Sequence, residues 1–288
     1  VALSCLALAG PPLTDLPDVV VPPLRVDRPR LVFRPEGQPS AWTFDRVRSL
    51  YQDDPFFRPL IDAGLKRPLE KESSPAACAL RYRLTGDESA AGRAIELLMQ
   101  RTYEDISFEY YSNGWEHALA YDWLHDHPRI THETRRTVEG FLFANAKRAL
   151  ELLNDDSWDL VPSLWHGRTK IANQAMVVAL SLDDSPEVLK LRTELARFFG
   201  DGWRGLRVSE GWPEGYAYWL GNRSFPFALA ADCWRTATGT ATVAGVDIIT
   251  AIRRTGLWHV YGLRPDNRFL LYGEDRKSTR LNSSHRIR

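Results

Sequence analysis

Residues 76–103 read AACALRYRLTGDESAAGRAIELLMQRTY, and this stretch decides the fold class. Its first part, Ala76–Leu84, carries apolar residues at helical spacing. Thr85-Gly86-Asp87 ends that helix and caps the next one, which we predict over Glu88–Tyr103. Because so short a connection makes the two helices antiparallel neighbours, the sequence predicts a helical hairpin.

The alternation of helices and short connections continues along the chain. Thr131-His132-Glu133-Thr134 begins a long amphipathic helix that we expect to end at Leu153. Further helices are predicted over these ranges: Glu116–His125, Arg168–Leu182, Pro186–Phe199, Pro213–Thr236 with a bend at Pro226, and Val243–Val260. Segments that alternate with period 2 are few, and the best is Phe269–Tyr272. The fold class is therefore mainly α, as an incomplete α/α toroid or solenoid of antiparallel helical hairpins, with a plain helical bundle as the alternative.

Both ends of the chain differ in composition from this helical region, which we assign to residues 44–262. Residues 1–10 resemble the last part of a signal peptide, an apolar stretch that ends in the small-x-small pattern Ala7-Leu8-Ala9. Export would place the protein in the periplasm of a bacterium or outside the cell. Residues 11–43 form a proline-rich arm that cannot be regular helix.

The C-terminal region is expected to leave the helical pattern. Residues 263–274 are predicted to hold the first strand of a further β domain, which is missing from this sequence. Residues 275–288 are polar and basic and resemble a translated sequencing-adapter read-through, so they carry no fold prediction.

The composition excludes several classes of protein. The chain has 288 residues, with 37 basic and 37 acidic side chains, so it has no strongly basic surface for nucleic acid and no reason to dock on an anionic membrane. No apolar run is long enough to span a bilayer. The 10 tryptophans are unusual, because flat apolar rings in such number also serve to stack on sugars. Cys78 and Cys233 lie among alanines and are predicted to be buried free thiols.

The sequence lacks the motifs of phosphate and zinc sites: GxGxxG, GxxxxGK[ST] and HExxH do not occur. His125-Asp126-His127 has the composition of a metal site, but it precedes Pro128 at a helix end, where polar residues are common. His117 is expected to be a packed or cleft-lining histidine. We therefore expect neither a metal nor a cofactor.

The first segment that could carry chemistry is residues 158–173, WDLVPSLWHGRTKIAN. A proline-interrupted loop brings Trp165, His166 and Arg168 to the start of an apolar helix, where the unpaired N–H groups and the helix dipole favour a carboxylate. His166 can act as a base or a donor, and Arg168 and Asn173 can hold an acidic group. The structural alternative is that His166 caps its helix and Arg168 is a solvated surface residue.

The second segment is residues 209–219, SEGWPEGYAYW. Trp212 precedes Pro213, which suits the first turn of a helix, and Glu214 stands where the dipole favours an anion. Tyr218 follows Glu214 by four positions and shares its helical face. The alternative is an aromatic packing knot at a helix start.

The two segments, in this order, resemble the heparinase II/III-like polysaccharide lyases, a group that includes alginate and oligoalginate lyases. Four stretches carry the likeness: Arg28–Phe33 resembles the signature "HPRLLF", Tyr82–Asp87 resembles "YxLTGD", Glu116–Leu124 resembles "ALAYDWL", and Glu210–Trp219 resembles "DGGWPEGxxYW". The resemblance implies an incomplete α/α toroid that is followed by antiparallel β-sheet domains.

The resemblance also implies the reaction. The family removes the C5 proton of a uronate ring and expels the oxygen at C4, which leaves a C4=C5 double bond. The proton becomes acidic only when the neighbouring carboxylate is neutralised, after which a tyrosine or histidine takes it. These roles carry over to Tyr218, with Tyr216 as its substitute, and to His166. The residues expected to bind the anionic polysaccharide are Arg168, Asn173, Glu214, Tyr216, Trp165, Trp115 and Trp212.

The sequence departs from the family in two ways. Trp165 stands where the "NHG" motif of some members has the asparagine that neutralises the carboxylate, so Arg168 or Asn173 would have to replace it. The second catalytic histidine of the family comes from its β region, which this sequence lacks, so the chain as given is expected to bind sugar yet catalyse poorly.

Two other functions remain open from the sequence. A glycoside hydrolase would need two carboxylates about 5–10 Å apart, and Glu214 with Asp159 or Glu116 is the pairing we consider. A helical domain that binds carbohydrate without catalysis is the other.

Overall fold

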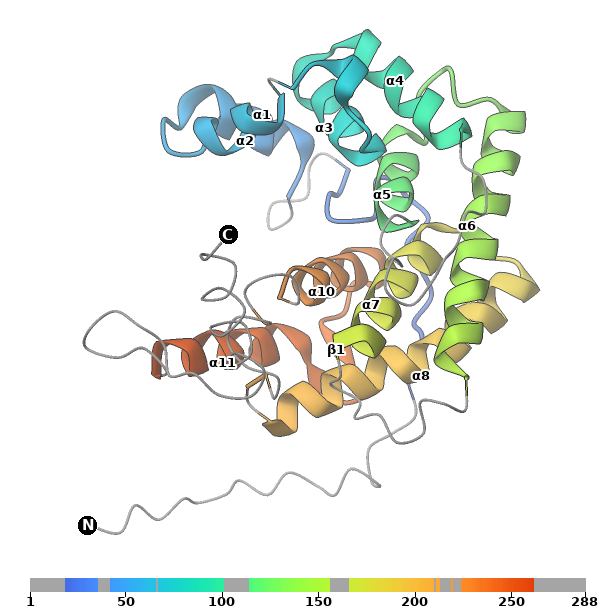
Figure 1. Cartoon of the computed structure of the whole chain (residues 1–288), viewed down its shortest axis with the longest axis vertical. Helices are drawn as coiled ribbons and strands as arrows, with labels where there is room; N and C mark the ends of the chain where they lie inside the picture. The colour runs from blue at the N-terminus through green and yellow to red at the C-terminus, as the bar shows by residue number, and fades with distance from the viewer. Residues whose placement is uncertain are drawn as a thin grey trace, which may run out of the picture.

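The computed structural model describes residues 19–35, 42–65, 67–100, 114–155, 166–209, 211–212, 219 and 224–261. Within these residues the chain is mainly helical, as predicted, and β structure is confined to one short hairpin (Figure 1). The helices are α1 (Phe44–Asp53), α2 (Arg58–Leu65), the 3-10 helix η2 (Leu69–Lys71), α3 (Pro75–Thr85), α4 (Glu88–Met99), α5 (Gly114–Leu124), α6 (His132–Leu153), α7 (His166–Ser181), α8 (Pro186–Ser209), α10 (Ser224–Thr238) and α11 (Ile248–Tyr261); the strands are β1 (Thr242–Val243) and β2 (Val246–Asp247).

The hairpin predicted from residues 76–103 is formed by α3 and α4. α3 ends at Gly86, which takes the left-handed conformation with φ +76° and donates its N–H to the Tyr82 carbonyl over 2.7 Å. Glycine tolerates this conformation because it has no Cβ. Asp87 then caps α4, since its side chain accepts a hydrogen bond from the Ser89 N–H. Local turn chemistry therefore produces the hairpin, and the prediction is confirmed.

α5 and α7 are enclosed on nearly every side. Residues 117–124 of α5 and residues 171–181 of α7 are all buried. A helix without a solvated face must be surrounded by other elements. The inner helices α3, α5, α7 and α10 pack against one another in this order. In Figure 1, α7 lies at the centre, with α5 above it and α10 to its left.

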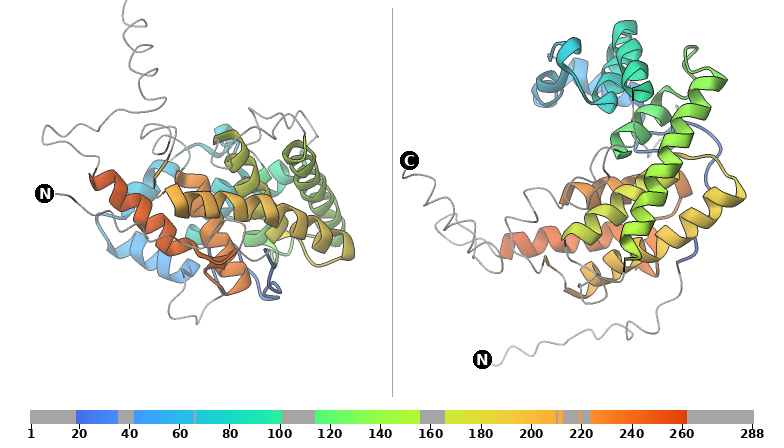
Figure 2. Two further views of the ribbon diagram at one scale, coloured as in Figure 1. Left: turned by 90° about the horizontal axis from the view of Figure 1, so that it is seen from below. Right: turned by 45° about the vertical axis from the view of Figure 1, so that its right-hand side comes forward.

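The long helices α6 and α8 pack against α7 from outside. α6 lies on the side that comes forward in the right-hand view of Figure 2, and α8 runs below α7 in Figure 1. α8 runs antiparallel to α7. Near its start, the Arg192 Nε donates to the Ala179 carbonyl near the end of α7 over 3.3 Å. Near its end, Gly202 lies beside the side chain of Thr169 in the first turn of α7.

Residues 19–34 belong to the proline-rich segment predicted over residues 11–43, and from here on the name arm refers to residues 19–34 alone. The arm lies across the C-terminal ends of the inner helices. The backbone N–H of Arg25 donates to the Ala237 carbonyl at the end of α10 over 2.8 Å. The Arg30 guanidinium donates to the carbonyls of Leu180 and Leu182, at and just beyond the end of α7, over 3.0 and 2.7 Å. The last carbonyls of a helix lack partners within it, and a cation is favourable there. The arm therefore stabilises these helix ends.

The end of α5 is held by the same arm through the buried side chain of Asp122. One carboxylate oxygen accepts a hydrogen bond from Arg28 Nη1 at 2.8 Å, and the other accepts the backbone N–H groups of Arg30 and Leu31 at 2.9 and 2.8 Å. Burial raises the pKa of the Asp122 carboxyl, and the Arg28 guanidinium opposes that rise. Because α5, α7 and α10 all end on the arm, they are parallel, and their N-termini lie at the opposite end of the inner helices.

α8 continues past the predicted end at Phe199 to Ser209. The prediction that the helix ends at Phe199 was wrong, and Gly200 and Gly202 both lie within α8. Gly200 lies at a contact with the arm. A Cβ on Gly200 would come close to the side chain of Val19. The glycine is explained by this close approach.

The region from α10 to α11 also differs from the prediction. α10 begins at Ser224 and has Pro226 in its first turn, where proline costs no hydrogen bond. The part of the predicted helix before Ser224 lies outside the described residues, except for Trp219. The helix predicted from Val243 begins only at Ile248. Ala244 and Gly245 precede it with φ +50° and +74° and form the two-residue turn of the β1–β2 hairpin.

Cys78 and Cys233 are buried free thiols, as predicted. Burial raises the pKa of Cys78 to about 11 and the pKa of Cys233 as well. None of the described helices is long and apolar enough to cross a membrane. The described helices run from Phe44 to Tyr261, and the predictions for residues 1–10, 263–274 and 275–288 fall outside the described residues.

Candidate functional site

The N-termini of α5, α7 and α10 lie at the same end of the protein, because the arm holds their other ends together. α7 packs against both α5 and α10. Trp115 at the start of α5 also meets Phe225 at the start of α10, with ring centroids 5.4 Å apart. We call this region, defined by Trp115, His166 and Phe225, the N-terminal end of the inner helices.

This end is suited to an anion. The first N–H groups of a helix have no acceptor within it, and the aligned peptide dipoles give it a partial positive charge. Here the parallel helices α5, α7 and α10 direct this charge to the same side of the protein. A carboxylate or sulfate is favoured there over a cation.

His166 is the first residue of α7, and its side chain is half-buried at this end. The Thr169 hydroxyl donates to the His166 carbonyl over 3.2 Å, which closes the first turn of the helix. The sequence prediction placed His166 at a helix start beside an apolar helix, and the structure has it there. An imidazole at this position can take or give a proton at the surface of the inner helices.

Arg168 points elsewhere. Two positions along a helix rotate a side chain by roughly 200°. The Arg168 guanidinium lies over the Phe198 ring of α8, 5.3 Å from its centroid. The structure therefore holds Arg168 toward the outer helix, and its side chain does not share the direction of His166.

Asn173 lies two helical turns from His166, on the same face of α7, and only 2% of it is exposed. Its Nδ2 donates to the Thr169 carbonyl over 2.7 Å. Its Oδ1 is buried and has no hydrogen-bond partner among the described residues. This burial favours a packing role over the predicted contact with a sugar carboxylate.

Trp115 and Phe225 form an aromatic pair at the N-terminal end of the inner helices. Their planes are inclined by 66°, and 54% of Phe225 is exposed. Exposed aromatic rings supply the flat apolar faces on which sugar rings stack. The sequence prediction included Trp115 but missed Phe225, because the helix predicted from Pro213 placed Phe225 in its interior. Its position directly before Pro226 is the signal that could have identified it.

Trp212 belongs to the core. It is 1% exposed and packs against Trp219 and Phe227, with ring centroids 5.3 and 5.8 Å apart. A ring enclosed in this way offers no open face to a sugar. The aromatic packing knot that the sequence left as an alternative is therefore present around Phe227, in the first turn of α10.

The remaining predicted site residues, Trp165, Glu214, Tyr216 and Tyr218, lie outside the described residues, as does Asp159. Glu116, which was paired with Glu214 in the hydrolase alternative, is half-buried in the first turn of α5. Among the described residues, Trp115 contacts Phe225, and His166 is the first residue of α7 at the same end of the inner helices. Arg168 lies over the Phe198 ring, and Asn173 and Trp212 are buried.

Three other described histidines are engaged in local contacts. His127 Nε2 lies 3.2 Å from Glu88 Oε2, and His125 Nδ1 lies 2.9 Å from Asp126 Oδ1, both near the C-terminal end of α5. His117 is buried against Phe141. The described part of the chain contains no cluster of His, Cys, Asp and Glu that could hold a metal ion.

No protein-family model matches the sequence, and no curated protein matches it at a significant level.

Proposed function

We propose that this protein is a secreted polysaccharide lyase that cleaves a uronate-containing anionic glycan by β-elimination. In this proposal the helices form an incomplete α/α toroid, and the glycan binds at the N-terminal end of the inner helices. The observation that carries the proposal is the convergence of the helix starts that hold His166, Trp115 and Phe225. An anion-favouring surface with an imidazole and exposed aromatic rings suits an acidic sugar.

The chemistry requires that negative charge be stabilised as the C5 proton leaves. The groups available for this are the positive end of α7 and the His166 imidazole, since Asn173 is buried and Arg168 is held against Phe198. Tyr218, starting as the phenolate, is proposed to take the C5 proton and then to give this proton to the departing C4 oxygen, which restores the phenolate. Each phenol and imidazole returns to its starting protonation after the product leaves.

The order of the motifs supports the same proposal. Tyr82–Asp87 forms the α3–α4 turn, and Glu116–Leu124 lies within the buried helix α5. Arg28–Phe33 lies in the arm that closes the C-terminal ends of the inner helices. These segments therefore lie in the helical scaffold on which the proposal depends.

The test is an incubation of the full chain with alginate, heparan sulfate and polygalacturonate as separate substrates. A lyase produces new ultraviolet absorbance from the C4=C5 double bond. New reducing ends without that absorbance would instead establish a glycoside hydrolase. Binding of a glycan without either product would leave a non-catalytic carbohydrate-binding domain, and absence of binding to all of them would refute the proposal.

Variants test the residues. Tyr218→Phe and His166→Ala are expected to abolish the absorbance change while the far-ultraviolet circular dichroism stays unchanged. The matched controls are Tyr82→Phe and His132→Ala, because Tyr82 lies on α3 and His132 is exposed at the start of α6. Turnover retained by Tyr218→Phe would remove that phenol from the mechanism.

A further inference from the structure

The buried face of α6 carries one polar side chain beyond its first turn. The buried residues that follow Thr134 on this helix are Val138, Leu142, Asn145, Ala146, Ala149, Leu150 and Leu153. Only 5% of Asn145 is exposed. A buried carboxamide costs free energy unless polar groups face it, so an asparagine on this otherwise apolar face calls for a specific contact.

That contact is with the first residue of α5. Gly114 is buried, and a Cβ placed on it would overlap the carboxamide of Asn145. The Cβ would lie 2.8 Å from Cγ and 3.1 Å from Nδ2, and Oδ1 is closer still. Only a residue without a Cβ allows α6 to come this close to the start of α5. The asparagine of α6 and the glycine of α5 therefore fit one another.

The contact lies next to the aromatic pair at the N-terminal end of the inner helices. Trp115 follows Gly114 directly in the chain, and its ring meets that of Phe225 at 5.4 Å. The first N–H groups of α5 have no acceptor within the helix, and Oδ1, an acceptor, is the atom of Asn145 nearest to this helix start. The backbone from which the Trp115 ring projects is thus held against α6.

We propose that Asn145 is a positioning residue for the N-terminal end of the inner helices. Its carboxamide sets how closely α6 approaches Gly114, and in this way it fixes the place of the Trp115 ring beside Phe225. Asn145 itself does not belong to the aromatic pair, so it acts through α5. Its effect on a glycan rests on the proposed function, whereas its effect on the Trp115 ring does not.

The first test is a cycle of Gly114→Ala, Asn145→Ala and the double variant, each made in the full chain labelled with 5-fluorotryptophan. The fluorine NMR signal of Trp115 is assigned through its loss in Trp115→Phe. Both single variants are expected to move this signal. Gly114→Ala should also lower the melting temperature, because the new Cβ displaces a carboxamide that is enclosed by close packing.

The double variant tests the direct contact. Once the carboxamide is removed by Asn145→Ala, the Cβ of Ala at position 114 has room, so the double variant should melt at a higher temperature than Gly114→Ala alone. Strictly additive changes in melting temperature would overturn the proposal. A Trp115 signal that stays at the wild-type position in Asn145→Ala would also overturn it.

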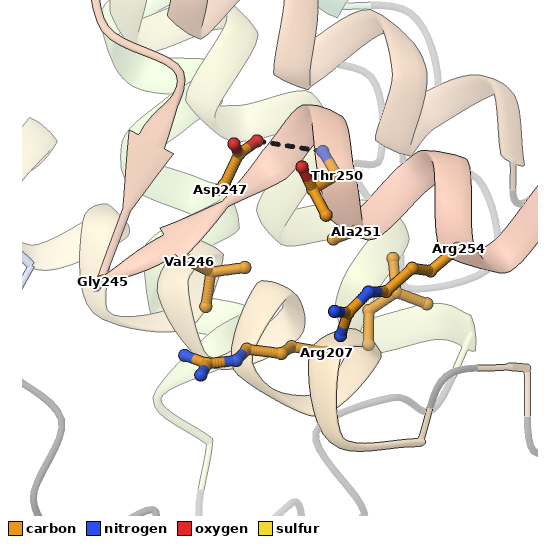
Figure 3. A pocket seen from close by; sticks show the side chains of 8 residues that line it. Arg207, Gly245, Val246, Asp247, Thr250, Ala251 and Arg254 are labelled. Carbon is orange, nitrogen blue, oxygen red and sulfur yellow. Dashed lines mark hydrogen bonds between the residues drawn. The ribbon is translucent and has the colours of Figure 1, made fainter. Parts of the chain in front are cut away.

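The matched control lies on another helix. Gly256 is in α11, and a Cβ there meets no described atom within 4 Å. α11 begins beside a separate hollow of about 240 Å³, where the Asp247 carboxylate accepts the Thr250 N–H (Figure 3). Gly256→Ala should leave the Trp115 signal in place. A movement as large as that in Gly114→Ala would show that any substitution of this kind moves the signal, and would refute the assignment to Asn145.

The second test concerns the glycan. With an alginate oligosaccharide as the probe in calorimetry, Asn145→Ala is expected to weaken binding by roughly 2- to 12-fold, the range for loss of an aromatic contact. In a Trp115→Ala chain, Asn145→Ala should cause no further loss, because it acts through that ring. An equal loss in both chains would overturn the route through Trp115. If the wild-type chain binds no acidic glycan, the proposed function fails, and the fluorine signals and melting temperatures still decide the role of Asn145.

Discussion

Replacement of Asp122 by asparagine tests whether the arm holds the inner helices together. The carboxylate of Asp122 is buried, pairs with Arg28 and accepts the backbone N–H groups of Arg30 and Leu31. Asparagine has nearly the same shape but offers one acceptor oxygen and one NH₂ group. Every group facing this position is a donor, so the NH₂ group must face N–H donors and leave at least one of them unsatisfied.

The magnitude follows from these contacts. Breaking a buried ion pair by removing one partner costs about 3–5 kcal/mol, because the remaining charge stays buried without compensation. Asparagine keeps one acceptor, so we expect the lower part of that range, about 3 kcal/mol. For a domain of this size, such a loss lowers the melting temperature by roughly 6–12 °C. A typical total stability of about 5–15 kcal/mol leaves the variant folded at room temperature.

The assay is urea and thermal unfolding followed by circular dichroism, with Asp126→Asn as the control. The Asp126 side chain is 78% exposed, and surface substitutions of this kind change stability by less than about 0.5 kcal/mol. In an Arg28→Met background, the effect of Asp122→Asn should shrink, because the buried cation is then absent. An Asp122→Asn variant as stable as the control would refute the role assigned to the arm.

Three further predictions concern other parts of the molecule. Burial raises the pKa of Cys78 to about 11, so this thiol should not react with a thiol reagent at pH 8 until the protein unfolds. Mass spectrometry of the labelled peptides measures the reaction, and rapid labelling of the native protein would contradict the burial of Cys78. Asp247→Ala should cost about 1 kcal/mol at pH 7 through loss of the α11 cap. The hydrogen bond from the Thr250 N–H lowers the pKa of Asp247, so the stabilisation by the charged carboxylate is present above the unfolded-state pKa and is lost as the pH falls through the lowered folded-state pKa. Urea unfolding at pH 7 and at pH 3 should therefore show a smaller difference in stability between wild type and variant at pH 3. An equal difference at both pH values would contradict this prediction. Phe225→Ala should weaken binding of an acidic oligosaccharide by roughly 2- to 12-fold without loss of stability, as measured by calorimetry, whereas the exposed Phe56→Ala control should bind normally.

Local patterns were sufficient for much of the helical fold. The α3–α4 turn was predicted from Thr85-Gly86-Asp87, because a left-handed glycine followed by an aspartate cap acts over only a few residues. The long helix predicted to begin at Thr131–Thr134 and to end at Leu153 is observed as His132–Leu153. Its N-cap and its apolar face both depend on residues close together in the sequence, so the prediction was possible. The burial of Cys78 also followed from the small apolar residues around it.

Contacts between distant segments were beyond these patterns. The helix predicted to end at Phe199 continues through Gly200, and nothing nearby in the chain indicates that Val19 packs against this glycine. Asp122 was part of a recognised motif, yet its pairing with the arm depends on how α5 meets residues more than ninety positions earlier. Phe225 meets Trp115 for the same reason.

The sequence by itself determined the helical class, the hairpin turns, the buried thiols and the expectation of an acidic sugar as substrate. Only the tertiary structure decided where the predicted residues lie: His166 and Trp115 at the starts of parallel helices, and Asn173 and Trp212 in the core. The physical reason is range. Helix propensity, capping and amphipathic period act over a few residues, whereas the direction and enclosure of a side chain depend on how whole helices pack.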